Sequence, residues 1–212
     1  MTFDDAVVRL RAGLAAPLPG APAQEALAPR PRRAWPPRFD IARIRDAAGL
    51  LIVFPLDHRP AIVLTVRAGT LGRHGGQVSL PGGVVDPGET FEQAALREAN
   101  EEIALPHGEV EVLGALTALD IPVSGFRLHP IVARAARRPP LAAADGEVDR
   151  ILEIPVAELF DPARFSVEER TRDGRTLTIP FFRLRGVEIW GATAMVLAEF
   201  LTLLGWVSPE KQ

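Results

Sequence analysis

The segment LPGGVVDPGETFEQAALREANEEIAL, residues 80–105, is the most informative part of this chain. It places six acidic side chains around a single arginine, Arg97, in a protein of 212 residues whose formal net charge is only −3. Glu98, Glu101 and Glu102 stand almost together in it. Like charges that close repel one another. The segment therefore predicts that something in the folded protein compensates for them.

Residues 92–103 are predicted to form a helix, because they contain no glycine or proline and Thr90 is a suitable N-cap. At about 100° per residue, the three glutamates fall on one face within an arc of about 100°. An apolar stripe lies roughly 120° away and consists of Ala95, Leu96, Ala99 and Ile103. The small alanines predict that the helix packs closely on a sheet, with its acidic face toward a cleft or solvent.

A solvated surface face is the ordinary explanation of a glutamate-rich helix, but three features favour a divalent cation. Lysines at i,i+4 do not relieve the repulsion, because Lys211 is the only lysine in the chain. The acids follow a loop, residues 81–89, whose glycines permit close backbone approach. Glu89 is placed to reach Arg97 and hold this loop on the helix. No Cys or His competes in the cluster, so the ligand oxygens favour Mg²⁺ over zinc.

The segment resembles the Nudix box, G-x5-E-x7-R-E-U-x-E-E-x-G-U, in which U is an aliphatic residue. Every charged position of the motif matches, counted from Gly83 through Glu89 and Arg97. Two positions depart from it. Ala99 is smaller than the usual aliphatic residue, and Ala104 replaces a glycine at the helix end, where glycine would ease the turn.

This resemblance implies a Nudix fold of the α/β (α+β) class, an α/β/α sandwich around a mixed sheet. It also implies hydrolysis of a diphosphate linked to another group, with Mg²⁺ or Mn²⁺ between the anionic substrate and the acidic site. Glu89 and Arg97 would hold the loop–helix geometry. The metal ligands carried over by position are Glu98, Glu101, Glu102 and the backbone carbonyl of Gly82.

The general base is left open by the motif, because members of the family differ in it. A carboxylate must lie within hydrogen-bond reach of the attacking water. Glu98 is one candidate and an acid outside the box is another. Glu147, in the segment GEVD, is the best candidate for an extra metal ligand or base supplied from a loop, with Asp149 as its nearest rival.

Residues 63–83, VLTVRAGTLGRHGGQVSLPGG, resemble the extended signature of the coenzyme A diphosphatase branch. Residues 124–132, 146–159 and 189–197 also resemble this branch, while Leu80 replaces the aromatic residue usual before the Pro-Gly-Gly. The matching positions upstream of the box are Leu64, Thr65, Arg67, Leu71, His74, Gly76, Gln77 and Val78.

The branch resemblance implies cleavage of coenzyme A, or its acyl or oxidised forms, to 3′,5′-ADP and a phosphopantetheine. Arg67 and Arg73 are candidates for binding this polyanion, because planar bidentate donors suit phosphate; the alternative is that they are solvated surface arginines. Gly83 and Gln77 are further candidates for substrate binding, although Gln77 could merely pair across the sheet. His74 could act in catalysis or stabilise its turn.

Two other functions stay open. A Nudix diphosphatase could act instead on ADP-ribose, a dinucleotide, a nucleotide-sugar or an oxidised nucleoside triphosphate, because substrate choice lies in loops outside the box. A Nudix-fold ligand sensor without catalysis would be expected to lose box carboxylates, and this chain keeps them all.

Composition excludes several classes of function. Apolar residues at 47% and charged residues at 24% are ordinary for a globular core. A sequence pI near 5.9 gives no basic field for nucleic acid. The absence of cysteine removes disulfides and thiolate chemistry and fits the cytoplasm. The acidic N-terminus is not that of a signal peptide, and the apolar run near the C-terminus is too short for a membrane span.

The N-terminal part is predicted to differ from the rest, giving a division into residues 1–46 and a Nudix domain at 47–212. Thr2 can cap a helix with Phe3, Val7, Leu10 and Leu14 at helical spacing. Residues 16–39 are rich in proline and alanine, cannot form a regular element, and should be a strap on the domain or a loose arm. This arm and the apolar C-terminal helix could support a homodimer.

The remaining elements are read from apolar runs and turn residues. The segments AAGLLIVF and AIVLTV predict two buried strands joined by a turn, and QVSLPGG predicts a short strand that ends in a tight glycine turn. The dipeptide at 173–174 predicts a hairpin. The segments EVEVLGALTAL and FRLHPIVARA are expected to form strands. PVAELF is expected to form a helical turn, and residues from about 192 to 204 a helix.

The aromatic residues have alternative roles. Phe126 could pack on an adenine or in the core, and Trp190 and Trp206 are assigned to the core or a dimer contact.

Overall fold

Two runs of buried apolar residues form the centre of the main sheet in the computed structural model, which describes residues 1–69, 76–172 and 174–209. β1 (Arg45–Leu56) and β2 (Arg59–Arg67) pair antiparallel across the turn Asp57-His58. Both turn residues have positive φ, 49° and 63°, a conformation that suits the twist of a two-residue hairpin turn. The predicted pair of buried strands is confirmed.

Within the described residues, the main sheet has eight strands and is mixed. Its central order is β3-β2-β1-β7-β5, with β4 beside β1, β6 beside β7 and β8 beside β2. β1 and β7 run parallel, whereas the other pairs are antiparallel. The other strands are β3 (Val78–Ser79), β4 (Gly82–Val84), β5 (Val110–Ala115), β6 (Leu119–Ile121), β7 (Phe126–Ala135) and β8 (Val148–Pro155).

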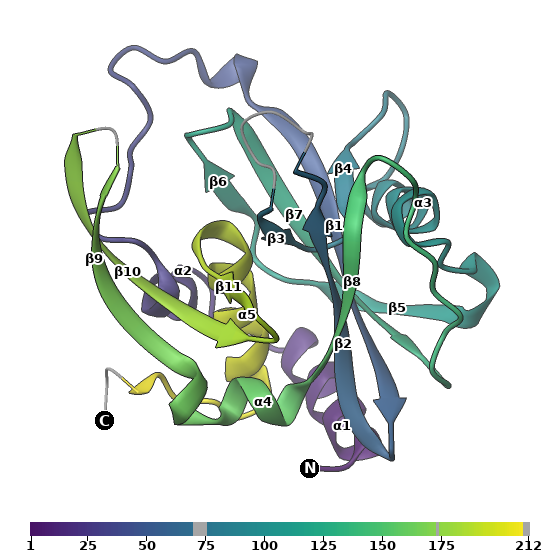
Figure 1. The fold of residues 1–212 in the computed structure, drawn as a ribbon. Coiled ribbons are helices and arrows are strands. Elements are labelled where there is room, and N and C mark those ends of the chain that lie inside the picture. Colours follow the sequence, from purple (N-terminus) through teal and green to yellow (C-terminus); the bar gives the residue numbers. More distant parts are fainter. Residues whose placement is uncertain (70–75, 173, 210–212) are drawn as a thin grey trace.

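Helices cover both faces of this sheet (Figure 1). On one face lies α3 (Phe91–Ile103), and on the other lie α1 (Phe3–Leu14) and α5 (Gly191–Leu203). Neighbouring residues of β1 point to opposite layers: Leu50 belongs to the core under α3, and Leu51 to the core under α1 and α5. This arrangement confirms the predicted α/β/α sandwich around a mixed sheet.

A smaller sheet follows β8 and stands beside α5 (Figure 1). It contains β9 (Phe165–Arg172), β10 (Arg175–Leu184) and β11 (Val187–Ile189). The predicted hairpin is therefore present, although Asp173 of its turn lies outside the described residues. The short helices are α4 (Val156–Phe160), which confirms the expected helical turn, and the 3-10 turns η1 (Glu25–Leu27), η2 (Ile41–Arg43), η4 (His107–Glu109) and η5 (Pro162–Arg164).

The expected tight turn at the glycine pair is wrong, because Gly82 and Gly83 lie in β4 and pair with Gly49 and Ala48 of β1. A Cβ atom added at Gly82 would lie 2.3 Å from the carbonyl oxygen of Ala48. Glycine is needed here for the close approach of two strands rather than for a turn.

The proline-rich segment 16–39 contains a short helix, α2 (Ala21–Gln24), contrary to the expectation that it holds no regular element. Pro22 stands in the first turn of this helix, where the N–H that proline lacks has no helical partner in any case. Glu199 of α5, which is fully buried, fastens α2. Its carboxylate accepts hydrogen bonds from Gly20 N (3.1 Å), Gln24 Nε2 (2.9 Å) and Thr117 Oγ1 (2.7 Å).

The segment after α2 also lies on the domain. Arg30 exchanges two backbone hydrogen bonds with Thr178 of β10, of 2.9 and 2.8 Å. The indole Nε1 of Trp35 donates to Asp120 Oδ2 at 3.3 Å, and the ring stacks on Phe39. Residues 16–39 are therefore a strap rather than a loose arm.

The large aromatic side chains divide between core and surface. Trp206 is buried and packs near Phe182, with 6.1 Å between ring centroids, so it belongs to the core. Phe126 is only half-buried, and Trp190 is half-buried at the start of α5. Within the described residues, no helix has the length and apolar character needed to cross a membrane.

Replacing Ala104 by glycine is expected to stabilise the protein. Ala104 ends α3 in the left-handed conformation, with φ 53° and ψ 32°, which strains a residue that carries a Cβ. We expect Ala104→Gly to raise the free energy of unfolding by about 0.5–1 kcal/mol in equilibrium urea denaturation. The matched control, Ala12→Gly on the exposed side of α1, should lower it by about 1 kcal/mol. Equal losses in both variants would contradict the assignment of strain.

Removing the Glu199 carboxylate is expected to release the strap. Glu199→Ala leaves several buried donors without an acceptor, so the free energy of unfolding should fall by about 2–4 kcal/mol. Limited proteolysis should then cut within residues 16–39 before the rest of the chain. Glu25→Ala, at an exposed carboxylate of the same segment, should change stability by less than about 0.5 kcal/mol. Wild-type stability and resistance in Glu199→Ala would disprove this role.

Candidate active site

Arg97 of α3 holds the loop between β4 and the helix. Its Nε and Nη2 atoms donate to the two carboxylate oxygens of Glu89, at 2.8 and 3.0 Å, and Nη2 also donates to the carbonyl of Val84 at 3.0 Å. The pKa of Glu89 falls to about 2, because of the Arg97 hydrogen bonds and a further one from the N–H of Asp86. The structure thus contains the Glu89–Arg97 pair that the sequence predicts.

The same guanidinium compensates part of the acidic face. Its Nη1 donates to Glu98 Oε1 at 2.9 Å and to Glu101 Oε2 at 3.3 Å. These bonds, with those to Glu89, raise the pKa of Arg97. Arg97 thus bonds three carboxylates and lies 3.9 Å from a fourth, that of Asp86. One cation shared in this way leaves net negative charge on this face of α3.

Gly83 allows Glu98 to lie against the backbone of β4. A Cβ atom added at Gly83 would come within 2.4 Å of the Glu98 carboxyl carbon, a distance that no real contact allows. On the other side of the helix, Ala95 and Ala99 are fully buried against β1. The expected close packing of α3 on the sheet brings its acidic face to the glycine pair.

Glu102 is the buried member of the acidic face. It is 5% exposed, its Oε2 accepts from the N–H of Gly82 at 3.1 Å, and its Oε1 lies 3.8 Å from Nη1 of Arg67. Burial raises the pKa of Glu102 to about 7, helped by the charges of Glu98 and Glu147 and opposed by the Gly82 hydrogen bond and by Arg67. The carboxylate is poorly compensated and would gain from a cation.

Glu98 and Glu102, the glycine pair and Arg67 line one hollow of about 300 Å³. It lies between α3, β4, the end of β2 and the loop before β8. Six predicted site residues meet there, and Glu147 does so from a segment far away in the sequence. Asp86 also lines the hollow and was missed, although its place in the five-residue spacer of the box marks it as a residue beside the site. The full lining is Arg67, Gly82, Gly83, Val84, Asp86, Glu98, Glu102 and Glu147.

Other predicted residues lie elsewhere. The side chain of Glu101 is 56% exposed and turns to Arg97 rather than into the hollow. Gln77 accepts the Arg67 N–H through its backbone carbonyl at 3.0 Å, which is the cross-sheet pairing left open above. Asp149, the rival of Glu147, is exposed on β8 and does not line the hollow. Arg73, His74 and Leu71 lie outside the described residues.

The donor chemistry of the hollow fits a hard divalent cation. The carboxylates of Glu98, Glu102 and Glu147 and the carbonyl of Gly82 offer oxygen atoms only, as Mg²⁺ and Mn²⁺ prefer. Within the described ranges, no three His, Cys, Asp or Glu side chains converge as a finished ligand set. Glu98 is bonded to Arg97 instead, so binding a cation requires side chains to turn.

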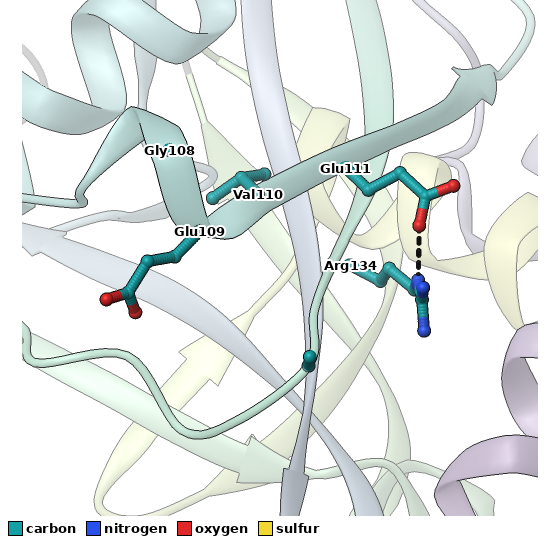
Figure 2. A pocket seen from close by; sticks show the side chains of 6 residues that line it. Gly108, Glu109, Val110, Glu111 and Arg134 are labelled. Carbon is teal, nitrogen blue, oxygen red and sulfur yellow. Dashed lines mark hydrogen bonds and ion pairs between the residues drawn. The ribbon is translucent and has the colours of Figure 1, made fainter.

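A second hollow, of about 170 Å³, lies beside β5 and lacks this uncompensated charge. Figure 2 shows its acid Glu111 paired with Arg134, at 2.6 Å between Oε2 and Nε. Glu109 is paired with Arg137 in the same way. Hydrogen bonds from arginine lower the pKa of both glutamates. The hollow at α3 is therefore the candidate active site.

Comparison with known proteins gives one consistent family. The model of the NUDIX domain matches residues 43–173. A protein of Salmonella paratyphi B, named "Uncharacterized Nudix hydrolase NudL", is 35% identical over 159 residues, which are 74% of this chain and 82% of that protein.

Two crystal structures share the fold. A MutT/nudix family protein from Enterococcus faecalis has a TM-score of 0.51 at 16% identity and covers 81% of this chain and 65% of its own. The MutT protein from Methanosarcina mazei has a TM-score of 0.50 at 15% identity and covers 76% of this chain and 94% of its own. At these identities the likeness concerns the fold alone.

Arg97→Lys is expected to weaken cation binding although it keeps the charge. Lysine cannot reproduce the fork that bonds both oxygens of Glu89 and the Val84 carbonyl. The affinity for Mn²⁺, measured by paramagnetic resonance of the free ion, should fall by about 10–100-fold. Arg59→Lys, at an exposed position at the far end of β1 and β2, is the matched control and should bind Mn²⁺ as the wild type does. Equal affinities in both variants would remove Arg97 from the site.

The buried Glu102 gives the metal-free protein a specific pH dependence. Because the pKa of Glu102 in the folded state, about 7, lies above its ordinary value of 4.5, the folded state binds its proton more tightly than the unfolded state does. This contribution favours folding below pH 4.5 and is lost as the pH rises through 7. In chelator, the wild type should lose on the order of 3 kcal/mol between pH 5 and pH 8 relative to Glu102→Gln. Parallel pH profiles of the two proteins would refute the raised pKa.

Proposed function

The chain belongs to the Nudix hydrolase family, and from this we propose that it is a coenzyme A diphosphatase. The family supports hydrolysis of a diphosphate bond in a nucleoside diphosphate derivative. The proposed substrate is coenzyme A or one of its derivatives. The products would be 3′,5′-ADP and 4′-phosphopantetheine, acylated where the substrate is.

One observation supports this substrate most. Arg67, which belongs to the segment resembling the coenzyme A branch, lines the same hollow as the box glutamates, 3.8 Å from Glu102. Residues upstream of the box therefore share its site, as a substrate-selecting segment should. Glu147 comes from residues 146–159, another segment that resembles the branch, and lines the hollow too.

Mg²⁺ or Mn²⁺, when bound, would neutralise the diphosphate and polarise its phosphoryl oxygens. Glu98, Glu102 and the Gly82 carbonyl would hold the ion, with Glu101 as a ligand by its position in the motif. In the proposed reaction, water attacks one phosphorus of the diphosphate, and the bond from that phosphorus to the bridging oxygen breaks.

The chain's own residues would orient the groups that react. Arg67 binds a phosphate oxygen through a charge-assisted hydrogen bond. Gly83, without a side chain, leaves room beside Glu98. A carboxylate takes the proton of the attacking water; Glu147, which is exposed on its loop and close to Glu102, and Glu98 are the two candidates. Arg97 and Glu89 keep the loop and helix in register during turnover.

The test is a product analysis by chromatography with mass detection. Purified protein is incubated with Mg²⁺ or Mn²⁺ and, in parallel, coenzyme A, ADP-ribose, NADH and a nucleoside triphosphate. Formation of 3′,5′-ADP and phosphopantetheine as the fastest reaction is expected, and excess chelator should abolish it. Faster cleavage of another diphosphate would replace the proposed substrate but keep the reaction class.

Glu102→Gln is the variant that separates an enzyme from a ligand sensor. Its kcat/KM should fall by about 100-fold or more, because the amide cannot replace a charged ligand. Glu169→Gln, at an exposed glutamate of β9, is the control and should keep wild-type kinetics. Unchanged turnover in Glu102→Gln, or no turnover of any diphosphate by the wild type, would contradict the proposed chemistry.

A further inference from the structure

Asp86 lines the hollow at α3 but takes no part in the chemistry proposed above. It begins the sequence DPGE, in which a proline followed by a glycine with φ 91° has the pattern of a type II turn. The N–H of Glu89 donates to the carbonyl of Asp86 at 3.1 Å, and the N–H of Asp86 donates to Glu89 Oε2 at 3.0 Å. The turn thus fixes the backbone of Asp86, while its side chain stays 66% exposed.

The Asp86 carboxylate lies just beyond hydrogen-bond reach of Arg97. Its Oδ2 is 3.9 Å from Nη2 of Arg97, which is too long for a hydrogen bond. Within the described ranges, this is the only ion pair of the Asp86 side chain. A shift of about 1 Å in this exposed side chain would turn the long ion pair into a charge-assisted hydrogen bond.

Binding of a cation in the hollow takes acceptors away from Arg97. Its Nη1 donates to Glu98 at 2.9 Å and to Glu101 at 3.3 Å. Both glutamates belong to the ligand set proposed above, so Nη1 loses these bonds when they turn to a cation. The side chain of Arg97 is only 27% exposed, so water replaces the lost bonds incompletely. A guanidinium left in this way opposes the binding of the cation.

Asp86 is the carboxylate that can replace the departing acceptors. Glu89 cannot, because both of its oxygens already accept from Nε and Nη2 of Arg97. Of the carboxylates that pair with Arg97 in the described part of the chain, Asp86 is then the one that neither leaves nor is fully used. It also stands on the turn that Arg97 holds, so the exchange requires no movement of the backbone.

We propose that Asp86 is a positioning residue, which takes over the guanidinium of Arg97 when Glu98 turns to a divalent cation. The inference rests on the proposed function only in that the hollow binds such a cation. The exchange leaves the bonds from Arg97 to Glu89 and to the Val84 carbonyl in place, so the loop stays on α3. Asp86 lowers the free-energy cost of releasing Glu98, and binding of the cation and pairing of Asp86 with Arg97 favour each other.

The affinity of single and double variants for Mn²⁺ alone tests this coupling. Asp86→Asn removes the charge but keeps a residue that suits the first position of the turn. By paramagnetic resonance of the free ion, its affinity should be about 3–10-fold weaker than that of the wild type, as expected for one hydrogen bond. In the Arg97→Lys background the same substitution should weaken binding by less than about twofold, because lysine lacks the fork that joins Glu89, Val84 and Asp86.

Two controls separate positioning from other roles. In chelator, Asp86→Asn should unfold at the wild-type temperature, because the metal-free protein lacks the bond; a lower temperature would show a purely structural role and overturn the proposal. Asp149→Asn removes the same charge from an exposed position of β8 that does not line the hollow. It should change the Mn²⁺ affinity by less than about twofold, and a loss equal to that of Asp86→Asn would reduce the effect to general charge attraction.

The double variant gives the decisive comparison. If Asp86→Asn weakens binding equally in the wild-type and Arg97→Lys backgrounds, Asp86 acts without Arg97, as a direct ligand would, and the proposal is overturned. Unchanged affinity in Asp86→Asn overturns it too. A failure of the proposed function looks different: a wild type that binds no Mn²⁺ removes the cation site and the exchange together, whereas coupled Mn²⁺ binding without cleavage of any diphosphate supports the exchange and contradicts only the function.

Discussion

The repulsion among the carboxylates of α3 is the constraint on which the rest of the site depends. Arg97 bonds Glu89, Glu98 and Glu101 and so compensates the outer part of the acidic face. Glu102, which is buried, stays poorly compensated, and its pKa rises to about 7 because of that burial. The folded protein therefore keeps an acidic group ready for a cation at the expense of its own stability.

Glycine residues beside α3 and an arginine opposite it accommodate this crowding of carboxylates. Gly82 and Gly83 let β4 approach β1 and the helix more closely than any side chain would allow. Opposite charge comes from outside the helix, because Arg67 at the end of β2 lies 3.8 Å from Glu102. Acidic groups that would hold a metal and one arginine that would bind an anion thus line one hollow.

The sequence predicted features that depend on neighbours along the chain. Thr90 as N-cap and the uninterrupted residues 92–103 predicted the position of α3. The spacing of the box predicted the pairing of Glu89 with Arg97. Features that depend on contacts between distant segments were missed or wrong. Examples are the role of the glycine pair in β4 and the burial of Glu199 under the strap. Their causes lie in packing, which no local pattern encodes.

A calorimetric titration of Mn²⁺ into protein freed of metal measures whether the acidic face of α3 binds a divalent cation. Wild type and Glu102→Gln would be compared at pH 7.5, where the Glu102 carboxylate is mostly ionised if its pKa is about 7. We expect saturable binding to the wild type and binding weaker by about 10-fold or more to the variant, because one charged ligand is lost. Equal binding by the two proteins, or none by the wild type, would show that the acidic face is not gathered for a cation.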